Sequence, residues 1–172
     1  IGEQPIDSAM RAFRDEFALR EAPPYPGSSD LYRHLKAVTP DSLQYYLEDT
    51  WHKITLYENK TETVSATLQP DSTYLVKLDI QTAKLYADSL GMEMPANYEG
   101  DYIDIGIFAA DDTDKNGRTR TNPIYLKKHK LAAGAHTLEI RVDELPAKAG
   151  IDPYNKLIDR IPDDNLISVD LE

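Results

Sequence analysis

The stretch that decides the fold class reads DYIDIGIFAADDTDKNGRTRTNPIYLKKHKLAAGAHTLEIRVDELP and runs from Asp101 to Pro146. Apolar residues occupy alternate positions in three of its segments, 103–107, 124–126 and 138–142, as they do in strands with one buried face. Turn-forming residues separate the segments, and the first connection contains an Asn-Gly pair. We predict a three-stranded meander that forms one sheet with an apolar and a polar face, and such a sheet requires a second layer.

The residues before this stretch supply the other strands of the predicted fold. The same alternation occurs at 54–57, 64–68 and 74–80, with turn residues between the segments. About seven strands result, which is typical of an immunoglobulin-like sandwich. The predicted fold class is therefore mainly β, an immunoglobulin-like antiparallel β-sandwich preceded by a short helical segment. We assign residues 1–52 to the helical segment and 53–172 to the sandwich domain with an extended C-terminal tail.

Three short helices are predicted in the first segment, over residues 6–20, over 29–38 and from Thr39 onward. Prolines end the first helix, and Thr39-Pro40-Asp41 has the residues of a helix start. Each helix carries an apolar stripe, and that of the first helix consists of Ile6, Met10, Phe13 and Phe17. Three short helices cannot bury all of this surface on one another. We expect it to pack against a part of the protein that is missing from this chain, or to be covered in a homodimer through residues 6–50.

The end of the chain differs from both parts. Residues 150–165 contain Asp-Pro and Pro-Asp-Asp-Asn turn formers with apolar residues between them and no lasting period. We interpret this segment as an ordered tail that lies over the sandwich. The chain begins at Ile1 without an initiator Met or a signal peptide, and Leu171-Glu172 resembles the junction to a purification tag. We therefore expect the chain to be a soluble piece of a longer protein.

Composition excludes several classes of function. The 172 residues include 19 Lys and Arg against 30 Asp and Glu, which gives a net charge of −11. Such a chain has no basic stripe for phosphates, so we expect no nucleic-acid partner. The absence of cysteine rules out disulfides, thiolate catalysis and Cys-based zinc sites. No apolar run is long enough to span a bilayer, and we expect no membrane contact by this chain.

One short motif has the residues of a cation site. Asp112, Asp114 and Asn116 match the first half of an EF-hand calcium loop, in which oxygens at positions one, three and five converge on the ion. The twelfth position, where a bidentate Glu belongs, is Pro123, and the flanking residues predict strands. A solvated hairpin tip is therefore the alternative interpretation of the same residues.

Other residues with chemical potential form no recognisable constellation. The four histidines do not occur in H-E-x-x-H, although His129 and His136 flank a turn and could approach each other across it. Tyr125 and Tyr154 could stack on sugars, but tyrosines in a sandwich are mostly packing residues. We nominate no catalytic and no cofactor-binding residue in this chain.

Several segments resemble one family. Residues 39–47, 54–59, 149–160 and 162–165 are similar to the C-terminal region of aminopeptidase N-like zinc metallopeptidases, the gluzincins. More narrowly, they resemble bacterial versions in which the peptidase is fused behind an ABC-type permease segment. The resemblance covers nearly the whole chain, and residues 151–165 are its most specific part.

The resemblance implies that the first 52 residues end the helical portion of a peptidase and that the rest is its β-sandwich. The family holds zinc with H-E-x-x-H and a downstream Glu, and these are absent, so no cofactor and no catalytic role carry over to this chain. Gly91-Met92-Glu93-Met94 is only superficially similar to the family's G-x-M-E-N motif. The implied function is a non-catalytic scaffold of a parent associated with the bacterial inner membrane. The alternative is a self-standing binding module for calcium, a glycan or a protein partner.

Overall fold

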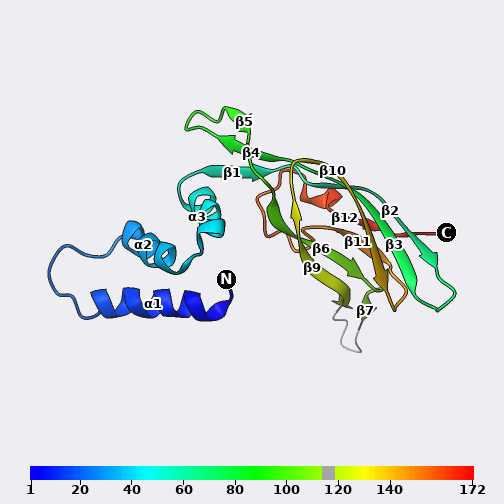
Figure 1. The fold of residues 1–172 in the computed structure, drawn as a ribbon, viewed down its shortest axis with the longest axis horizontal. Coiled ribbons are helices and arrows are strands. Elements are labelled where there is room, and N and C mark those ends of the chain that lie inside the picture. Colours follow the sequence, from blue (N-terminus) through cyan, green and yellow to red (C-terminus); the bar gives the residue numbers. More distant parts are fainter. Residues whose placement is uncertain (114–118) are drawn as a thin grey trace. The chain divides into compact units, whose positions relative to one another are not determined.

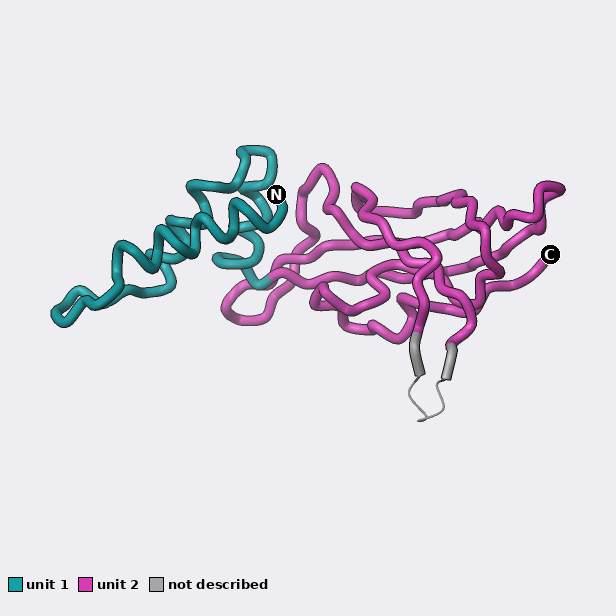
Figure 2. Tube along the Cα trace, turned by 90° about the horizontal axis from the view of Figure 1, so that it is seen from below, with its two compact units in different colours: residues 1–54 teal, residues 55–172 magenta. Residues whose placement is uncertain are grey.

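The computed structural model describes residues 1–113 and 119–172, and the chain folds as two compact units, residues 1–54 and 55–172 (Figure 2). The boundary expected from the sequence, after residue 52, falls two residues before this division. Among the described residues, no helix combines the length and the apolar character needed to cross a membrane.

The first unit contains three helices and one 3-10 turn (Figure 1). Helix α1 is Glu3–Phe17 and α2 is Ser28–Val38; the turn η1 is Asp41–Leu43, and α3 is Gln44–Trp51. The helices α1 and α2 lie antiparallel, side by side. The predicted helix start at Thr39 is wrong, because Thr39 is the C-cap residue of α2 and its Oγ1 donates to the carbonyl of Leu35 at 2.8 Å.

In its described residues, the second unit contains the strands and one 3-10 turn. The strands are β1 (Ile54–Tyr57), β2 (Lys60–Leu68), β3 (Tyr74–Thr82), β4 (Lys84–Ala87), β5 (Glu93–Pro95), β6 (Asp101–Phe108), β7 (Asp112–Thr113), β8 (Thr119–Arg120), β9 (Pro123–Leu131), β10 (Gly134–Val142), β11 (Lys148–Ile151), β12 (Leu166–Ser168) and β13 (Asp170–Leu171). The turn η2 is Pro162–Asp164.

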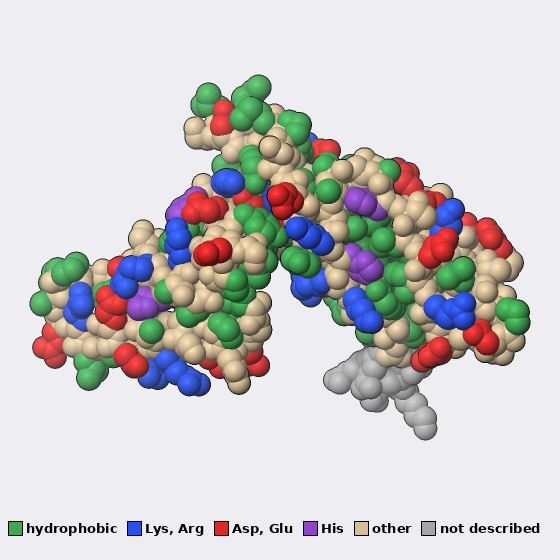
Figure 3. Space-filling model, in the orientation of Figure 1, with side chains coloured by type: hydrophobic (Ala, Val, Ile, Leu, Met, Phe, Trp, Pro, Cys, Tyr) green, Lys and Arg blue, Asp and Glu red, His purple; other side chains and the backbone are tan. Residues whose placement is uncertain are grey.

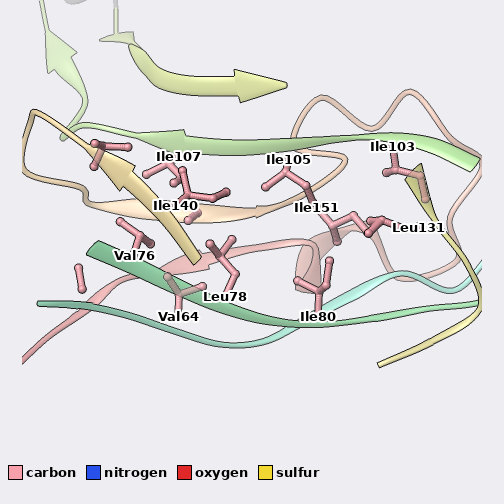
Figure 4. Packing of buried hydrophobic residues seen from close by; sticks show 13 residues of the cluster. Val64, Val76, Leu78, Ile80, Ile103, Ile105, Ile107, Leu131, Ile140 and Ile151 are labelled. Carbon is pink, nitrogen blue, oxygen red and sulfur yellow. The ribbon is translucent and has the colours of Figure 1, made fainter. Parts of the chain in front are cut away.

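Two four-stranded sheets form the sandwich, in the orders β10-β3-β2-β13 and β12-β11-β6-β9. Their alternating residues meet in one core, where Ile103, Ile105 and Ile107 lie opposite Val76 and Leu78 (Figure 4). The predicted mainly β, antiparallel sandwich with a short helical N-terminal part is therefore confirmed. An immunoglobulin-like character of this sandwich remains a prediction.

The predicted three-stranded meander is wrong in one of its pairings. Strand β9 pairs with β6, but β10 pairs with β3 over nine residues, from Gly134 opposite Thr82 to Val142 opposite Tyr74. The chain turns at Gly134, where φ is +120°, and passes from one sheet to the other. The prediction that Ile140 and Val142 of β10 face the core is confirmed, because both are buried. The same alternation, however, allows the strand to pair within either sheet.

Strand β6 is buried on both faces, although its sequence predicted only one buried face. Besides the three isoleucines, Asp104 and Phe108 are buried, because the C-terminal segment covers this side of the strand. The ring of Pro153 lies where a side chain at position 106 would project, and Tyr154 packs edge-on against Phe108 at 6.0 Å. Further on, β12 joins β11 and β13 joins β2, so the tail contributes a strand to each sheet.

Candidate functional site

The residues of the predicted calcium loop are only partly described. Asp114 and Asn116 lie outside the described residues, and Asp112 belongs to the two-residue strand β7, which pairs with β8. Calcium binding by this loop therefore stays a prediction.

The four histidines have separate partners. In the helical unit, His34 Nε2 lies 2.7 Å from Glu16 Oε2 and His52 Nδ1 lies 2.9 Å from Glu48 Oε2. In the sandwich, His129 Nε2 contacts the hydroxyl of Tyr125 at 2.7 Å, and His136 Nε2 lies 2.8 Å from the carbonyl of Ala132. Burial, together with the charge of Lys127, lowers the pKa of His129.

The histidines do not assemble a metal centre in the described part of the chain. Over residues 1–113 and 119–172, no group of three or more His, Cys, Asp or Glu side chains is arranged to hold a metal ion. His129 and His136, which the sequence placed on either side of one turn, stand on strands of different sheets.

The helical unit exposes most of its apolar side chains. Of the apolar residues in positions 1–54, all of which the structure describes, Ala9 alone is buried. Large side chains remain exposed on α1, on α3 and outside the helices, and we call them the apolar set of the helical unit: Ile1, Ile6, Met10, Leu19, Tyr25, Tyr46 and Trp51. Other apolar side chains, such as Phe13, Phe17 and Leu35, are half-buried, so this part of the chain has no fully buried apolar cluster of its own.

Polar and aromatic contacts hold the three helices together instead. Arg33 of α2 pairs with Glu16 of α1 at 2.8 Å, and the hydrogen bond from Arg33 lowers the pKa of Glu16. The hydroxyl of Tyr32 donates to Glu48 of α3 at 2.5 Å. These contacts are exposed or half-buried, and such pairs contribute little to stability in water.

The start of the C-terminal segment is tied to β6 by a charged network. Asp152 is buried and its carboxylate accepts the backbone N–H groups of Lys156 and Leu157, at 3.0 and 2.9 Å. Its own N–H donates to the carbonyl of Asp104 at 2.8 Å. The Asp104 carboxylate in turn pairs with Lys156 at 2.8 Å and with Lys128 of β9 at 3.1 Å. Residues that the resemblance singled out thus fasten the tail to the sheet.

The two carboxyl groups of this network have opposite pKa shifts. Burial raises the pKa of Asp152, against the opposing effect of its backbone hydrogen bonds. Burial would also raise the pKa of Asp104, but the hydrogen bonds from Lys156 and Lys128 outweigh it and lower that pKa. Asp104 is therefore the carboxyl group of this network whose charged form the fold stabilises.

A second buried pair joins β4 to β6. Lys84 Nζ lies 2.8 Å from Asp101 Oδ2, and both side chains are almost fully buried. The same oxygen accepts a hydrogen bond from the hydroxyl of Tyr57 at 2.8 Å, and the ring of Tyr98 lies 4.9 Å from the ammonium. Sequence reasoning missed this pair, because a lysine in an alternating segment is normally assigned to the solvent face.

The β4–β5 hairpin carries an exposed apolar tip. Leu90 is 87% exposed, and Met92 and Met94 are exposed as well. Figure 3 shows hydrophobic side chains gathered on this hairpin. The segment Gly91-Met92-Glu93-Met94, which is only superficially similar to the G-x-M-E-N motif, lies on this hairpin.

Comparison with known proteins gives no relative: no family model, no curated protein and no solved structure matches the chain. The resemblance to aminopeptidase N-like enzymes therefore stands on the residues quoted for it.

Proposed function

We propose that this chain is a non-catalytic scaffold of an aminopeptidase-like zinc metallopeptidase, in which the helical unit docks on the catalytic domain. The observation that carries the proposal is the exposed apolar set of the helical unit. Monomeric proteins rarely expose many large apolar side chains unless these form a contact site. A unit with one buried alanine as its apolar core gains little from folding alone, and a partner surface supplies the missing burial.

The well-packed core of the sandwich also supports this proposal. Thirteen buried residues from both sheets form its hydrophobic cluster. At about 25 cal/mol per Å² of apolar surface, a cluster of this kind supports an independently folded domain. A self-sufficient domain joined to a helical unit without a core suits a support for a neighbouring domain. The resemblance of residues 149–165 to the peptidase family adds the chemical class of that neighbour.

The proposal is tested first by activity. The chain alone should release no coumarin from an aminoacyl-coumarin substrate, with or without added zinc, and should not retain zinc on dialysis. Turnover that a chelator abolishes would overturn the proposal, because it would require a catalytic metal held by this chain.

A second test addresses the docking surface. At high concentration the apolar set should drive self-association, and the double variant Ile6→Glu/Met10→Glu should remove it without changing the melting of the sandwich. The matched control is Asp7→Asn/Arg11→Gln on the same exposed helix, which should self-associate like the original chain. Light scattering after gel filtration gives the mass, and a strictly monomeric original chain at all concentrations would count against the docking surface.

The alternative proposal is a self-standing binding module, and the exposed tip of the β4–β5 hairpin favours it. If that hairpin binds a protein partner, Leu90→Glu and Met92→Glu should abolish binding while Ile6→Glu/Met10→Glu should not. The opposite pattern supports the scaffold.

A further inference from the structure

Buried polar atoms without a hydrogen-bond partner gather where the tail meets the start of β2. Among the described residues, Asn59 Oδ1, Asn59 Nδ2, Asp164 Oδ1 and Asn165 Oδ1 are buried and have no partner. The side chains of Asn59 and Asn165 are almost completely enclosed, because these residues are only 2% and 1% exposed. An unpaired buried polar group is costly, so several such atoms on neighbouring segments indicate a bound species that pairs with them.

Hydrogen bonds bring Asn59 and Asn165 to one carboxylate, that of Asp159. Asp159 Oδ2 accepts the backbone N–H of Asn59 at 2.9 Å and the side-chain Nδ2 of Asn165 at 3.4 Å. The free Oδ1 of Asn165 belongs to the same amide group and therefore lies beside Asp159. Asp164 is the residue before Asn165 and the last residue of η2.

The alternation of the β2 segment turns the Asn59 side chain toward the same place. Tyr57, Asn59 and Thr61 are buried, whereas the residues between them are exposed. Thr61 Oγ1 donates to the backbone carbonyl of Asn165 at 2.6 Å. Asn59 therefore faces the side of the strand against which Asn165 is held.

The electrostatics of this cluster favour a cation. Burial and the charge of Asp159 raise the pKa of Asp164, and the charge of Lys60 opposes them. Lys60 itself pairs with Glu62 at 2.9 Å, and Arg160 pairs with Glu58 and Glu93. Among the described residues, Asp159 and Asp164 thus form no short ion pair with a basic side chain, although the charge of Lys60 acts on Asp164.

We propose that a hard divalent cation, calcium in preference to magnesium, binds between Asn59, Asp164 and Asn165 and fastens the tail to β2. The three free oxygens are amide and carboxylate oxygens, the ligands that calcium prefers, and water molecules complete its shell. A water ligand can also accept from Asn59 Nδ2. Magnesium demands a near-ideal octahedron, which three oxygens from an irregular turn and a strand end do not offer. One carboxylate with two amides falls outside the groups of three acidic or histidine side chains considered above.

The experiment is thermal unfolding of the complete chain, first with a chelator and then with about 5 mM calcium or magnesium, a concentration above the weakest calcium sites. A ligand bound only by the folded state raises its melting temperature. We expect calcium to raise the melting temperature of the sandwich by about 5 °C and magnesium to raise it by less.

Two variants assign the effect to this cluster. Asp164→Asn keeps the shape of the side chain and removes its charge, and should weaken the calcium effect about tenfold in concentration. Asp164→Ala should abolish it, while the chain still folds, because Asp164 Oδ1 has no partner to lose. The matched control is Asp163→Ala, at the exposed neighbouring position, which should respond to calcium like the original chain.

Three results would overturn the proposal. No calcium effect in the original chain means that water alone fills the site. An effect that survives in Asp164→Ala means that calcium binds elsewhere. An effect abolished by Asp112→Ala and retained in Asp164→Ala assigns the ion to the loop after β6.

Discussion

At the scale of single residues, Gly150 shows how closely the tail approaches the sheet. A Cβ at this position would lie 1.9 Å from the carbonyl oxygen of Asn165 and 2.8 Å from Thr61 Oγ1. The first neighbour is backbone, so it cannot move aside without displacing the tail. Only glycine allows β11 to pack against both the tail and β2 here.

Gly150→Ala should therefore be strongly destabilising. We expect a loss of about 2–4 kcal/mol in the free energy of unfolding, at the upper end of overpacking effects because the clash is with backbone. Urea unfolding followed by far-ultraviolet circular dichroism measures this loss of stability. Gly106→Ala should cost less, since the atoms nearest its Cβ belong to the rings of Phe108 and Pro153. Equal stability of Gly150→Ala and the original chain would show that the tail does not pack as described.

The charge of Asp104 predicts how stability depends on pH. Burial alone would raise its pKa, but the hydrogen bonds from Lys156 and Lys128 lower it below the ordinary value. The folded-state pKa is thus below the unfolded one, about 3.9, so the contribution is full above that pH and is lost as pH falls through the folded pKa. Asp152 has the opposite sign, because burial raises its pKa, so its ionisation lowers stability and this loss is relieved as pH falls.

Replacing Asp104 should remove this part of the acid sensitivity. Asp104→Asn should lower the free energy of unfolding at pH 7 by about 1–3 kcal/mol, because Lys156 and Lys128 lose their partner. The free energies of unfolding of the two proteins should converge as pH falls below the folded-state pKa of Asp104, where the original carboxyl is protonated as well. The exposed Asp163→Asn is the control. A constant difference between Asp104→Asn and the original chain at all pH values would contradict the assignment.

At the scale of elements, periodicity predicted the strands better than their partners. Alternation of apolar residues located β2, β3, β6 and β10 and the side of each strand that faces the core, since local residues suffice to show this side. It did not show that the second face of β6 is buried or that Leu68 of β2 is exposed. Pairing depends on residues far away in sequence, and β10 joined β3 for that reason. The start of α3 was misplaced because Thr39 and Pro40 suit the end of one helix as well as the start of the next.

The candidate site was predictable only in part. The motif from Ile151 to Asn165 marked the tail as special, but alternation and composition gave no reason for Asp152 or Asn165 to be buried. Their burial depends on β6 and β2, about 50 to 100 residues away in sequence, as the hydrogen bonds from Lys156 to Asp104 and from Thr61 to Asn165 show. The burial of Lys84 was not predictable for the same reason, since its partner Asp101 lies on another strand.

The tail acts as one structural element, which a truncation can test. Ending the chain after Ile151 removes β12 and β13 and uncovers Asp104 and Phe108 on β6. We expect loss of cooperative unfolding and binding of a hydrophobic dye, because apolar surface and strand edges become exposed. Ending the chain after Val169 removes β13 alone and should cost much less. A truncated chain at Ile151 that still unfolds cooperatively would show that the tail only decorates the sandwich.

At the scale of the whole molecule, the two units differ in how they bury apolar surface. The sandwich has a cluster built from both sheets, whereas the helical unit relies on exposed ion pairs and ring contacts. Local stability follows buried contacts, and opening free energies range from near zero to the global value. We therefore expect the helical unit to open readily in the isolated chain and to become stable when it binds a partner.

Hydrogen exchange of the isolated chain measures whether the helical unit is stable without a docking partner. Amides of α1, α2 and α3 should exchange within minutes at neutral pH, while those of β2, β3 and β6 should stay protected for hours. Self-association at high concentration should slow exchange in α1, and Ile6→Glu/Met10→Glu should abolish that slowing. Uniform protection across residues 6–50 in a strictly monomeric sample would contradict the account, because it would show that the helical unit is stable without a docking partner.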